Sequence, residues 1–342
     1  MKNVHISPVD NEILIKLIDS YDPTQVIAIV DENTMQFLEE FHYMTDINID
    51  AIQLPAGEEH KNIQTLAGIW KDLTDNNFRR DGLIINLGGG VITDLGGFAA
   101  ATYKRGVDFI NIPTTLLAMV DAAIGGKTGI DFFDFKNQIG VIKDAKAVFC
   151  DVKYLETLPK DELLSGFAEV VKHGLVADEK YWRYCTGTPY EELKWTKVVN
   201  GSIDIKGGIV ARDPEEKGER KLLNFGHTIG HAIESLRLEQ GKPILHGFGV
   251  AAGMIMEANI SMQKGLLSKE SYEKIEQKIN SLFPKIKFLK SEFPELLEIM
   301  KNDKKNNSDE INFTLLEEIG KGIVNQSASK EEIEKAMGSY IA

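Results

Sequence analysis

The chain has 342 residues, of which 43% are hydrophobic and 27% charged, and its formal net charge is -13. This length exceeds one typical domain, so about two domains with a sizeable core are expected. The acidic balance argues against nucleic acid or an anionic membrane as a partner, because both require a basic surface. Two cysteines, Cys150 and Cys185, are too few for a disulfide framework, and neither a signal-like start nor a long apolar window is present. These features predict a cytoplasmic protein that binds no membrane.

The two halves of the sequence have different periodicities. The first half alternates short β-branched runs with longer amphipathic stretches, and its expected strands are 26–30, 47–54, 83–87, 109–112 and 146–149. Runs such as LIIN are apolar without alternation, which is typical of parallel strands covered on both faces. Helical spacing dominates the second half, in segments 160–176, 224–239, 246–263 and 269–283. We therefore predict an α/β domain with a parallel sheet at 1–155 and a helical domain at 156–342.

A glycine run, Gly88 to Gly90, stands between an expected strand and a helix that should begin near Ile92. Glycines at such a turn let the backbone approach a pyrophosphate at the positive end of the helix. The spacing is not GxGxxG, and a tight strand-to-helix connection is an equally good interpretation of the run alone. Asp31, which could bind a ribose hydroxyl or simply cap a turn, and the pair Thr114 and Thr115 also follow expected strands. Together these strand ends favour a nucleotide site.

Histidines with metal-ligand spacing occur in the second half. HTIGH places His227 and His231 on one face of a helix, and His246 opens the next helical segment. Glu169 and His173 form another pair at helical spacing. Nitrogen and oxygen ligands without thiolates suit a Lewis-acid site, although two histidines on one helix are often only surface residues. The spacing alone leaves open which of these side chains would bind the ion.

Several cationic side chains stand in glycine-rich or apolar surroundings, which is unusual in so acidic a chain. Lys127 follows two glycines, Lys136 precedes Asn137, and Arg220 lies shortly before the histidines. A single lysine is usually a solvated side chain. The association of these cations with the metal candidates favours phosphate and carboxylate recognition instead.

Taken in chain order, these segments resemble the 3-dehydroquinate synthase family over nearly the whole length. The matching elements are PAGEEHK, LGGGVITDLGGFAAATYKRG, IPTTLLAMVDAAIGGKTGID, FKNQIG, TLPKDELLSGFAEVVKHGL, RKLLNFGHTIGHAIE, LHG and NDKKN. The resemblance implies a Rossmann-like N-terminal domain, an all-α C-terminal domain, an active site in the cleft between them and a homodimer. It also implies NAD and one divalent metal, Zn or Co, as cofactors.

The resemblance assigns roles to individual residues. It implies that the metal ligands are Glu169, His227 and His246, with His231 beside the metal. The implied NAD contacts are Asp31, Glu58, Lys61, Gly89, Gly90, Val91, Asp94, Thr114, Thr115, Leu117, Asp121, Lys127, Lys136, Thr157, Leu158 and Glu162. The implied substrate contacts are Lys127, Lys136, Asn137, Lys172, Lys206, Arg220, Asn224, His231 and one of Lys304 and Lys305. Arg105 matches the arginine that reaches the partner subunit's phosphate site in the family.

The reaction implied by the resemblance converts 3-deoxy-D-arabino-heptulosonate 7-phosphate into 3-dehydroquinate and phosphate. It proceeds by transient oxidation with NAD, β-elimination of phosphate, re-reduction and an intramolecular aldol closure. Three departures from the family pattern are Phe135, where a glycine is usual, Phe248 after HG, and INFTLL in place of a more hydrophobic last strand. None of them removes an expected ligand or cation.

Other functions share parts of this pattern. A metal-dependent polyol or alcohol dehydrogenase would also join a glycine loop to a helical domain with histidines, but it would need no phosphate cradle. A related cyclase acting on a neutral sugar phosphate would not need the carboxylate clamp expected of Arg220 and Lys206. A catalytically silent homologue would not need intact metal and phosphate residues.

Overall fold

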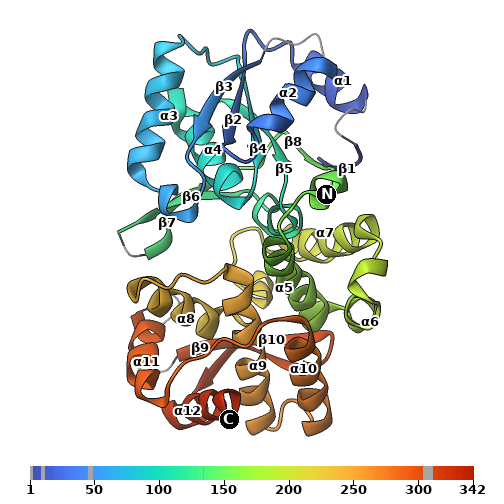
Figure 1. Ribbon diagram of the computed structural model, residues 1–342, viewed down its shortest axis with the longest axis vertical. Helices are drawn as coiled ribbons and strands as arrows, with labels where there is room; N and C mark the ends of the chain where they lie inside the picture. The colour runs from blue at the N-terminus through green and yellow to red at the C-terminus, as the bar shows by residue number, and fades with distance from the viewer. Residues whose placement is uncertain (1–2, 9–11, 45–48, 134, 303–310) are drawn as a thin grey trace. The chain divides into compact units, whose positions relative to one another are not determined.

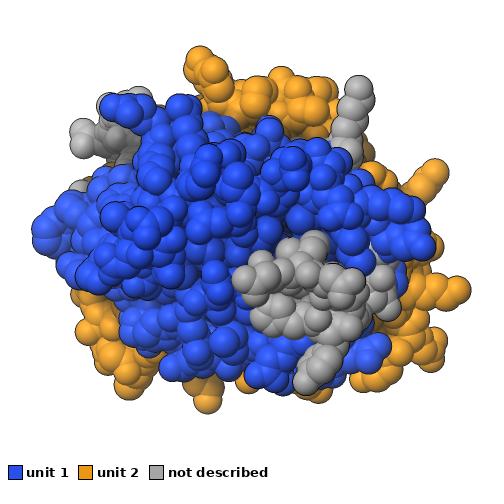
Figure 2. All heavy atoms as spheres, turned by 90° about the horizontal axis from the view of Figure 1, so that it is seen from above, with its two compact units in different colours: residues 1–159 blue, residues 160–342 orange. Residues whose placement is uncertain are grey.

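The computed structural model describes residues 3–8, 12–44, 49–133, 135–302 and 311–342. It divides into two compact units, unit 1 at residues 1–159 and unit 2 at residues 160–342 (Figure 2). Lys304 and Lys305 lie outside the described residues. No helix among the described residues is long and apolar enough to cross a membrane. The roles expected of the two domains, and the cleft expected between them, stay predictions.

Unit 1 is built on a six-stranded sheet in the order β1-β8-β5-β4-β2-β3, and every neighbouring pair in it is parallel (Figure 1). Its strands are β1 (Val4–Ile6), β2 (Val26–Asp31), β3 (Ile49–Leu54), β4 (Leu83–Gly88), β5 (Asp108–Pro113) and β8 (Ala147–Cys150). Its helices are α1 (Glu12–Tyr21), α2 (Met35–Met44), α3 (Ile63–Asp75) and α4 (Gly90–Thr102). The predicted parallel α/β fold is confirmed.

The strands at the centre of this sheet are almost entirely buried, as expected of parallel strands covered on both faces. All six residues of β4 are buried, and helix α4 packs against β4 and β5. Helix α4 begins at Gly90, slightly earlier than the predicted start near Ile92. A second, antiparallel pair, β6 (Lys127–Phe132) and β7 (Phe135–Ile142), was not predicted as strands. Its residues are glycine-rich and partly exposed, so no apolar alternation marks them.

Unit 2 is mainly helical, as predicted. Its helices are α5 (Lys160–Ala177), α6 (Glu179–Gly187), α7 (Trp195–Arg212), α8 (His227–Glu239), α9 (His246–Gln263), α10 (Lys269–Leu282), α11 (Phe293–Asn302) and α12 (Lys330–Ile341). Helix α9 is apolar nearly all round and contacts α5, α8, α10 and α12, so it forms the core of the unit. An all-α domain was expected, and the correction is an antiparallel hairpin of β9 (Ile311–Glu318) and β10 (Lys321–Ala328).

Short helical turns complete the chain. They are η1 (Glu58–His60), η2 (Tyr103–Arg105), the π-helical turn η3 (Ala118–Ala122), η4 (Val152–Glu156), η5 (Tyr190–Glu192), η6 (Glu219–Asn224) and η7 (Lys290–Glu292). Several of them carry or adjoin residues that the sequence singled out.

A partly buried ion pair anchors the end of helix α8 to η7. Arg237 donates hydrogen bonds of 2.7 and 3.3 Å to the two carboxylate oxygens of Glu292, which also accepts from Gln240 and from the backbone of Leu289. These donors, Arg237 foremost, lower the pKa of Glu292 from 4.5 to about 2. Because the folded-state pKa is depressed, this contribution to stability is complete above about 4.5 and is lost as the pH falls toward about 2.

We therefore expect Glu292→Gln to lower the free energy of unfolding by about 1–2 kcal/mol at neutral pH. The difference from wild type should shrink through the acid range just given. Urea unfolding of both proteins along a pH series measures it, and a difference independent of pH would contradict the assigned pKa shift.

Candidate functional site

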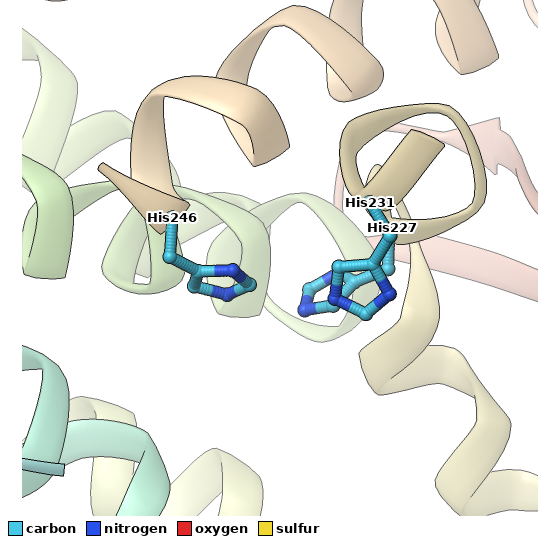
Figure 3. Close-up of side chains that lie close together, drawn as sticks. All are labelled: His227, His231 and His246. Carbon is cyan, nitrogen blue, oxygen red and sulfur yellow. The ribbon is translucent and has the colours of Figure 1, made fainter. Parts of the chain in front are cut away.

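Three histidines from two helices converge in unit 2 (Figure 3). His227 and His231 lie one turn apart at the start of α8, and His246 is the first residue of α9. One ring nitrogen from each lies within 4.8 Å of the others. The ring centroids are 5.1 to 5.7 Å apart, so the rings face a common point without stacking.

The carboxylate of Glu169, on helix α5, joins this cluster. Its Oε1 atom lies 3.5 Å from His227 Nε2 and 3.5 Å from His246 Nε2. Tetrahedral ligands about 2.1 Å from one ion lie about 3.4 Å from one another. Both separations from Glu169 Oε1 therefore fit one divalent ion held by two imidazoles and a carboxylate.

The Nδ1 atoms of His227 and His246 each have a hydrogen-bond partner, and these partners determine where the ring protons lie. His227 Nδ1 donates to the carbonyl oxygen of Phe225 at 3.0 Å, and His246 Nδ1 contacts Glu234 Oε1 at 2.9 Å. A carbonyl or carboxylate oxygen only accepts, so Nδ1 carries a proton in both rings. His227, whose pKa is lowered, presents the lone pair of Nε2, whereas His246, whose pKa is raised, must release the proton of Nε2 before it can bind an ion. Such partners orient metal-binding histidines and raise their basicity.

The electrostatics of the cluster depend on its burial. Burial, with a smaller effect of Lys172, holds the pKa of His227 well below its usual value. For His246, burial acts to lower the pKa, but Glu234 and Glu169 outweigh it and raise the pKa to about 10. Lys172 is paired with the fully buried Glu169 one turn away on α5. The site therefore concentrates carboxylates and imidazoles around a buried point, which is the environment that a divalent cation favours.

The other predicted substrate residues of unit 2 are mostly buried. Lys206 on α7 is 6% exposed and Arg220 in η6 is 2% exposed. Arg220 Nη1 donates to the carbonyl oxygen of Pro214 at 2.7 Å, and Asn224 donates to Glu216 at 2.6 Å. Because η6 runs directly into Phe225 and His227, Arg220 and Asn224 are tied to the start of α8. Cations are rarely buried unless an anion or a dipole compensates them.

In unit 1, the candidate nucleotide residues lie at the carboxyl ends of adjacent strands. Strand β2 pairs with β3 on one side and with β4 on the other, so the strand order reverses between β2 and β4. Open α/β sheets bind ligands beside such a switch point. Asp31 ends β2, and Gly89 caps helix α4 after β4, without a side chain that could cap the helix. A Cβ atom at Gly89 would lie 3.1 Å from the side chain of Thr115, so the loop is closely packed.

The carboxylate of Asp31 also stabilises the turn that follows β2. Its Oδ1 accepts hydrogen bonds from the backbone of Asn33 and from the backbone and hydroxyl of Thr34. Of the two roles predicted for Asp31, the structure shows that of capping a turn. A ribose contact would use the remaining oxygen.

A polar network connects predicted residues from separate segments of unit 1. The Nζ atom of the buried Lys61 donates to Asp94 Oδ2 and to Asn137 Oδ1, each at 2.6 Å. Lys136 Nζ lies 3.9 Å from Glu58 Oε1. Burial acts to lower the pKa of Lys61, but Asp94, Glu58 and Asp131 together raise it, so this lysine is charged. Helix α4, η1 and hairpin β6–β7 are thus linked through one ammonium group.

Asp131 was not singled out in the sequence, although it accepts a hydrogen bond of 2.6 Å from the backbone of Asn137. Burial raises the pKa of Asp131. Glu234 was missed in the same way, although it contacts His246. Both are acids in otherwise apolar or glycine-rich segments, and that contrast is the signal that could have identified them.

The remaining predicted residues are dispersed along the two units. In unit 1, Val91 lies in the first turn of α4, Thr114 and Leu117 follow β5, Asp121 lies in η3, Lys127 opens β6, and Thr157 and Leu158 follow η4. Glu162 lies in the first turn of α5, where burial raises its pKa. Arg105 and its neighbour Lys104 have positive φ angles of 68° and 48°. Such backbone strain in two consecutive residues is often associated with function.

Known structures share this fold. The chain superimposes on a 2-epi-5-epi-valiolone synthase from Streptomyces hygroscopicus subsp. jinggangensis, solved with NAD+ and Zn2+, with a TM-score of 0.87 and 23% identity over 99% of this chain and 96% of that one. A 2-deoxy-scyllo-inosose synthase, solved with carbaglucose-6-phosphate, NAD+ and Co2+, matches with a TM-score of 0.83 and 23% identity over 98% and 96%. The chain therefore shares its fold with this class of synthases.

Sequence comparison identifies the family within that class. The family model of the 3-dehydroquinate synthase N-terminal region matches residues 51–165, and that of the C-terminal region matches residues 166–306. A 3-dehydroquinate synthase of Parabacteroides distasonis is 43% identical over 290 residues, which cover 84% of this chain and 82% of that protein. The chain belongs to the 3-dehydroquinate synthase family, and the predicted resemblance is confirmed.

Proposed function

We propose that this protein is a 3-dehydroquinate synthase that depends on NAD and one divalent metal. The single observation that carries the proposal is the convergence of Glu169 Oε1 with the Nε2 atoms of His227 and His246, at 3.5 Å from each. This convergence occurs in a chain of the 3-dehydroquinate synthase family that also has the buried cations Lys172, Lys206 and Arg220 in the same unit. The substrate is 3-deoxy-D-arabino-heptulosonate 7-phosphate, and the products are 3-dehydroquinate and phosphate.

Glu169, His227 and His246 would hold the metal, Zn or Co, with His231 beside it. A bound divalent ion supplies a Lewis acid that lowers the pKa of coordinated hydroxyls and stabilises developing negative charge on oxygen. Glu234 orients His246 through its Nδ1 atom, and the carbonyl oxygen of Phe225 does the same for His227. These contacts prepare the ligand atoms before the ion binds.

Unit 1 would hold the dinucleotide at the switch point of its sheet. The unpaired N–H groups at the start of helix α4 and the adjacent glycines suit the pyrophosphate, and Asp31 suits a ribose hydroxyl. When bound there, NAD would supply a reversible hydride acceptor, so the overall reaction would involve no net redox change. Lys61, already charged, holds Asp94 and Asn137 in place beside the glycine loop.

The substrate carries two kinds of anion, and the cations divide between them. Lys127 and Asn137 of the β6–β7 hairpin, one of Lys304 and Lys305, and Arg105 from the partner protomer of a homodimer would bind the phosphate. Arg220, with Lys206 and Lys136, would bind the carboxylate, since a guanidinium presents a planar pair of donors. Lys172 is a further substrate contact. Tight binding of both anions aligns the reacting carbon atoms between them.

His231 and Asn224 would transfer protons near the reacting hydroxyls. His231 is partly exposed and lies within 4.8 Å of both ligand histidines, so it can reach a group bound to the metal. An imidazole can both accept and donate a proton, which suits it to this role.

Phosphate release from 3-deoxy-D-arabino-heptulosonate 7-phosphate by the purified protein tests the proposal, with and without NAD and after dialysis against a chelator. We expect release that requires both NAD and metal and leaves no net NADH. Accumulation of NADH would support a dehydrogenase instead. Absence of turnover, followed by turnover of a neutral sugar phosphate, would support a related cyclase, and failure with both substrates would support a silent homologue.

A further inference from the structure

The helices that carry the three histidines are packed backbone to backbone. A Cβ atom on Gly253 of α9 would lie 2.0 Å from the carbonyl oxygen of Gly226, the residue before α8. A Cβ atom on Gly230 would lie 2.9 Å from the carbonyl oxygen of Gly249. Gly226 itself has a φ angle of 80°, a conformation that favours glycine. The start of α8 is thus held directly on α9.

A buried carboxylate from α9 completes this junction. Glu257 is fully buried, and its Oε2 accepts a hydrogen bond of 2.6 Å from the backbone N–H of Gly226. Its Oε1 accepts one of 3.2 Å from the backbone N–H of Ile229. Gly226 is the N-cap residue of α8 and has no side chain with which to cap the helix. Glu257 therefore does what an N-cap side chain would do, and its charge lies at the positive end of the helix dipole.

His227 lies between the two backbone groups that Glu257 holds. The backbone on each side of this histidine is therefore fixed to α9, the helix whose first residue is His246. The Nδ1 atom of His227 is in turn held by the carbonyl oxygen of Phe225, next to Gly226. The direction in which His227 Nε2 points thus depends on the contact between Glu257 and the start of α8.

We propose that Glu257 is a positioning residue for the metal site, which sets His227 Nε2 at its distance from Glu169 and His246. This inference rests on the proposed function, since it concerns the metal that these residues would hold. Glu257 is not expected to touch the metal or the substrate. Its effect would pass through the backbone of Gly226 and Ile229.

The test measures Co2+ binding by the full-length protein. Titration gives the affinity, and the visible d–d absorption of the bound ion reports the ligand geometry. In Glu257→Gln the amide keeps one acceptor oxygen but turns an NH2 donor toward a backbone N–H. We expect its Co2+ affinity to fall about 10–100-fold, with a changed absorption spectrum. Glu257→Asp restores two acceptor oxygens and should recover part of the affinity.

Ser329→Ala is the matched control, because it removes the N-cap hydrogen bond of α12, a helix that supplies no candidate ligand. It should lower Tm and leave Co2+ affinity and spectrum unchanged. Wild-type affinity and spectrum in Glu257→Gln would overturn the proposal, whatever its Tm. If Glu257→Gln does not fold, an unchanged spectrum in Glu257→Asp, together with wild-type affinity, overturns it equally. Failure of the wild-type protein to bind Co2+ would instead overturn the metal site and the proposed function.

Discussion

Replacing His227 with alanine is expected to abolish metal binding and to reduce kcat by about 10³-fold, because the ion contributes several kcal/mol to the reaction. The fold should persist. His227 is a buried imidazole whose pKa lies well below its usual value, so it carries no charge on which a folded-state ion pair depends. Metal content of the purified variant and phosphate release measure the two effects.

His5→Ala is the matched control, since His5 stacks on Phe149 in unit 1 and has no proposed role in the site. It should retain metal and activity. His231→Ala and Glu169→Gln distinguish the ligands from their neighbour: we expect the first to keep the metal and lose activity, and the second to lose both. Loss of metal from His231→Ala with full metal in Glu169→Gln would show that the three histidines alone form the site.

Replacing Arg220 with lysine is expected to lower kcat/KM for the carboxylate-bearing substrate by about 30–150-fold, which corresponds to about 2–3 kcal/mol. Arg220 is buried, and its Nη1 atom is already directed by the carbonyl oxygen of Pro214. A lysine has one ammonium group and cannot keep this contact while also presenting a planar pair of donors. Steady-state kinetics of phosphate release measure the loss.

The control for this variant is Arg212→Lys, an exposed arginine that pairs with Glu219 at 2.7 Å. Its kcat/KM should match that of the wild-type protein, because exposed ion pairs contribute little. An Arg220→Lys variant with unchanged kcat/KM would remove the carboxylate clamp from the proposed function. A substrate without a carboxylate would then become the better candidate.

The parallel sheet and the long helices were predictable because their signals are local. The apolar run at 83–87 was enough to identify β4, and the periodicity at 246–263 was enough to identify α9. The hairpins β6–β7 and β9–β10 differ in this respect. Their strands pair with one another, and their stability depends on that partner more than on any apolar pattern. The C-terminal domain was consequently expected to be all-α, although INFTLL was noted at the place of a last strand in the family.

The sequence by itself determined the family, strands β2, β3, β4, β5 and β8 of the parallel sheet, helices α5, α8, α9 and α10, and the residue types available for metal, nucleotide and anion binding. It left Glu169, His173 and the three histidines as alternatives until the family resemblance ordered them. Only the tertiary structure showed that Glu169 Oε1 meets two Nε2 atoms at 3.5 Å, and that Lys61 joins Asp94 to Asn137 at 2.6 Å. It also revealed Glu234 and Glu257 as partners of the histidine helices. Periodicity records which face of an element is buried, whereas these contacts join residues far apart in the chain, and their distances depend on how the elements pack.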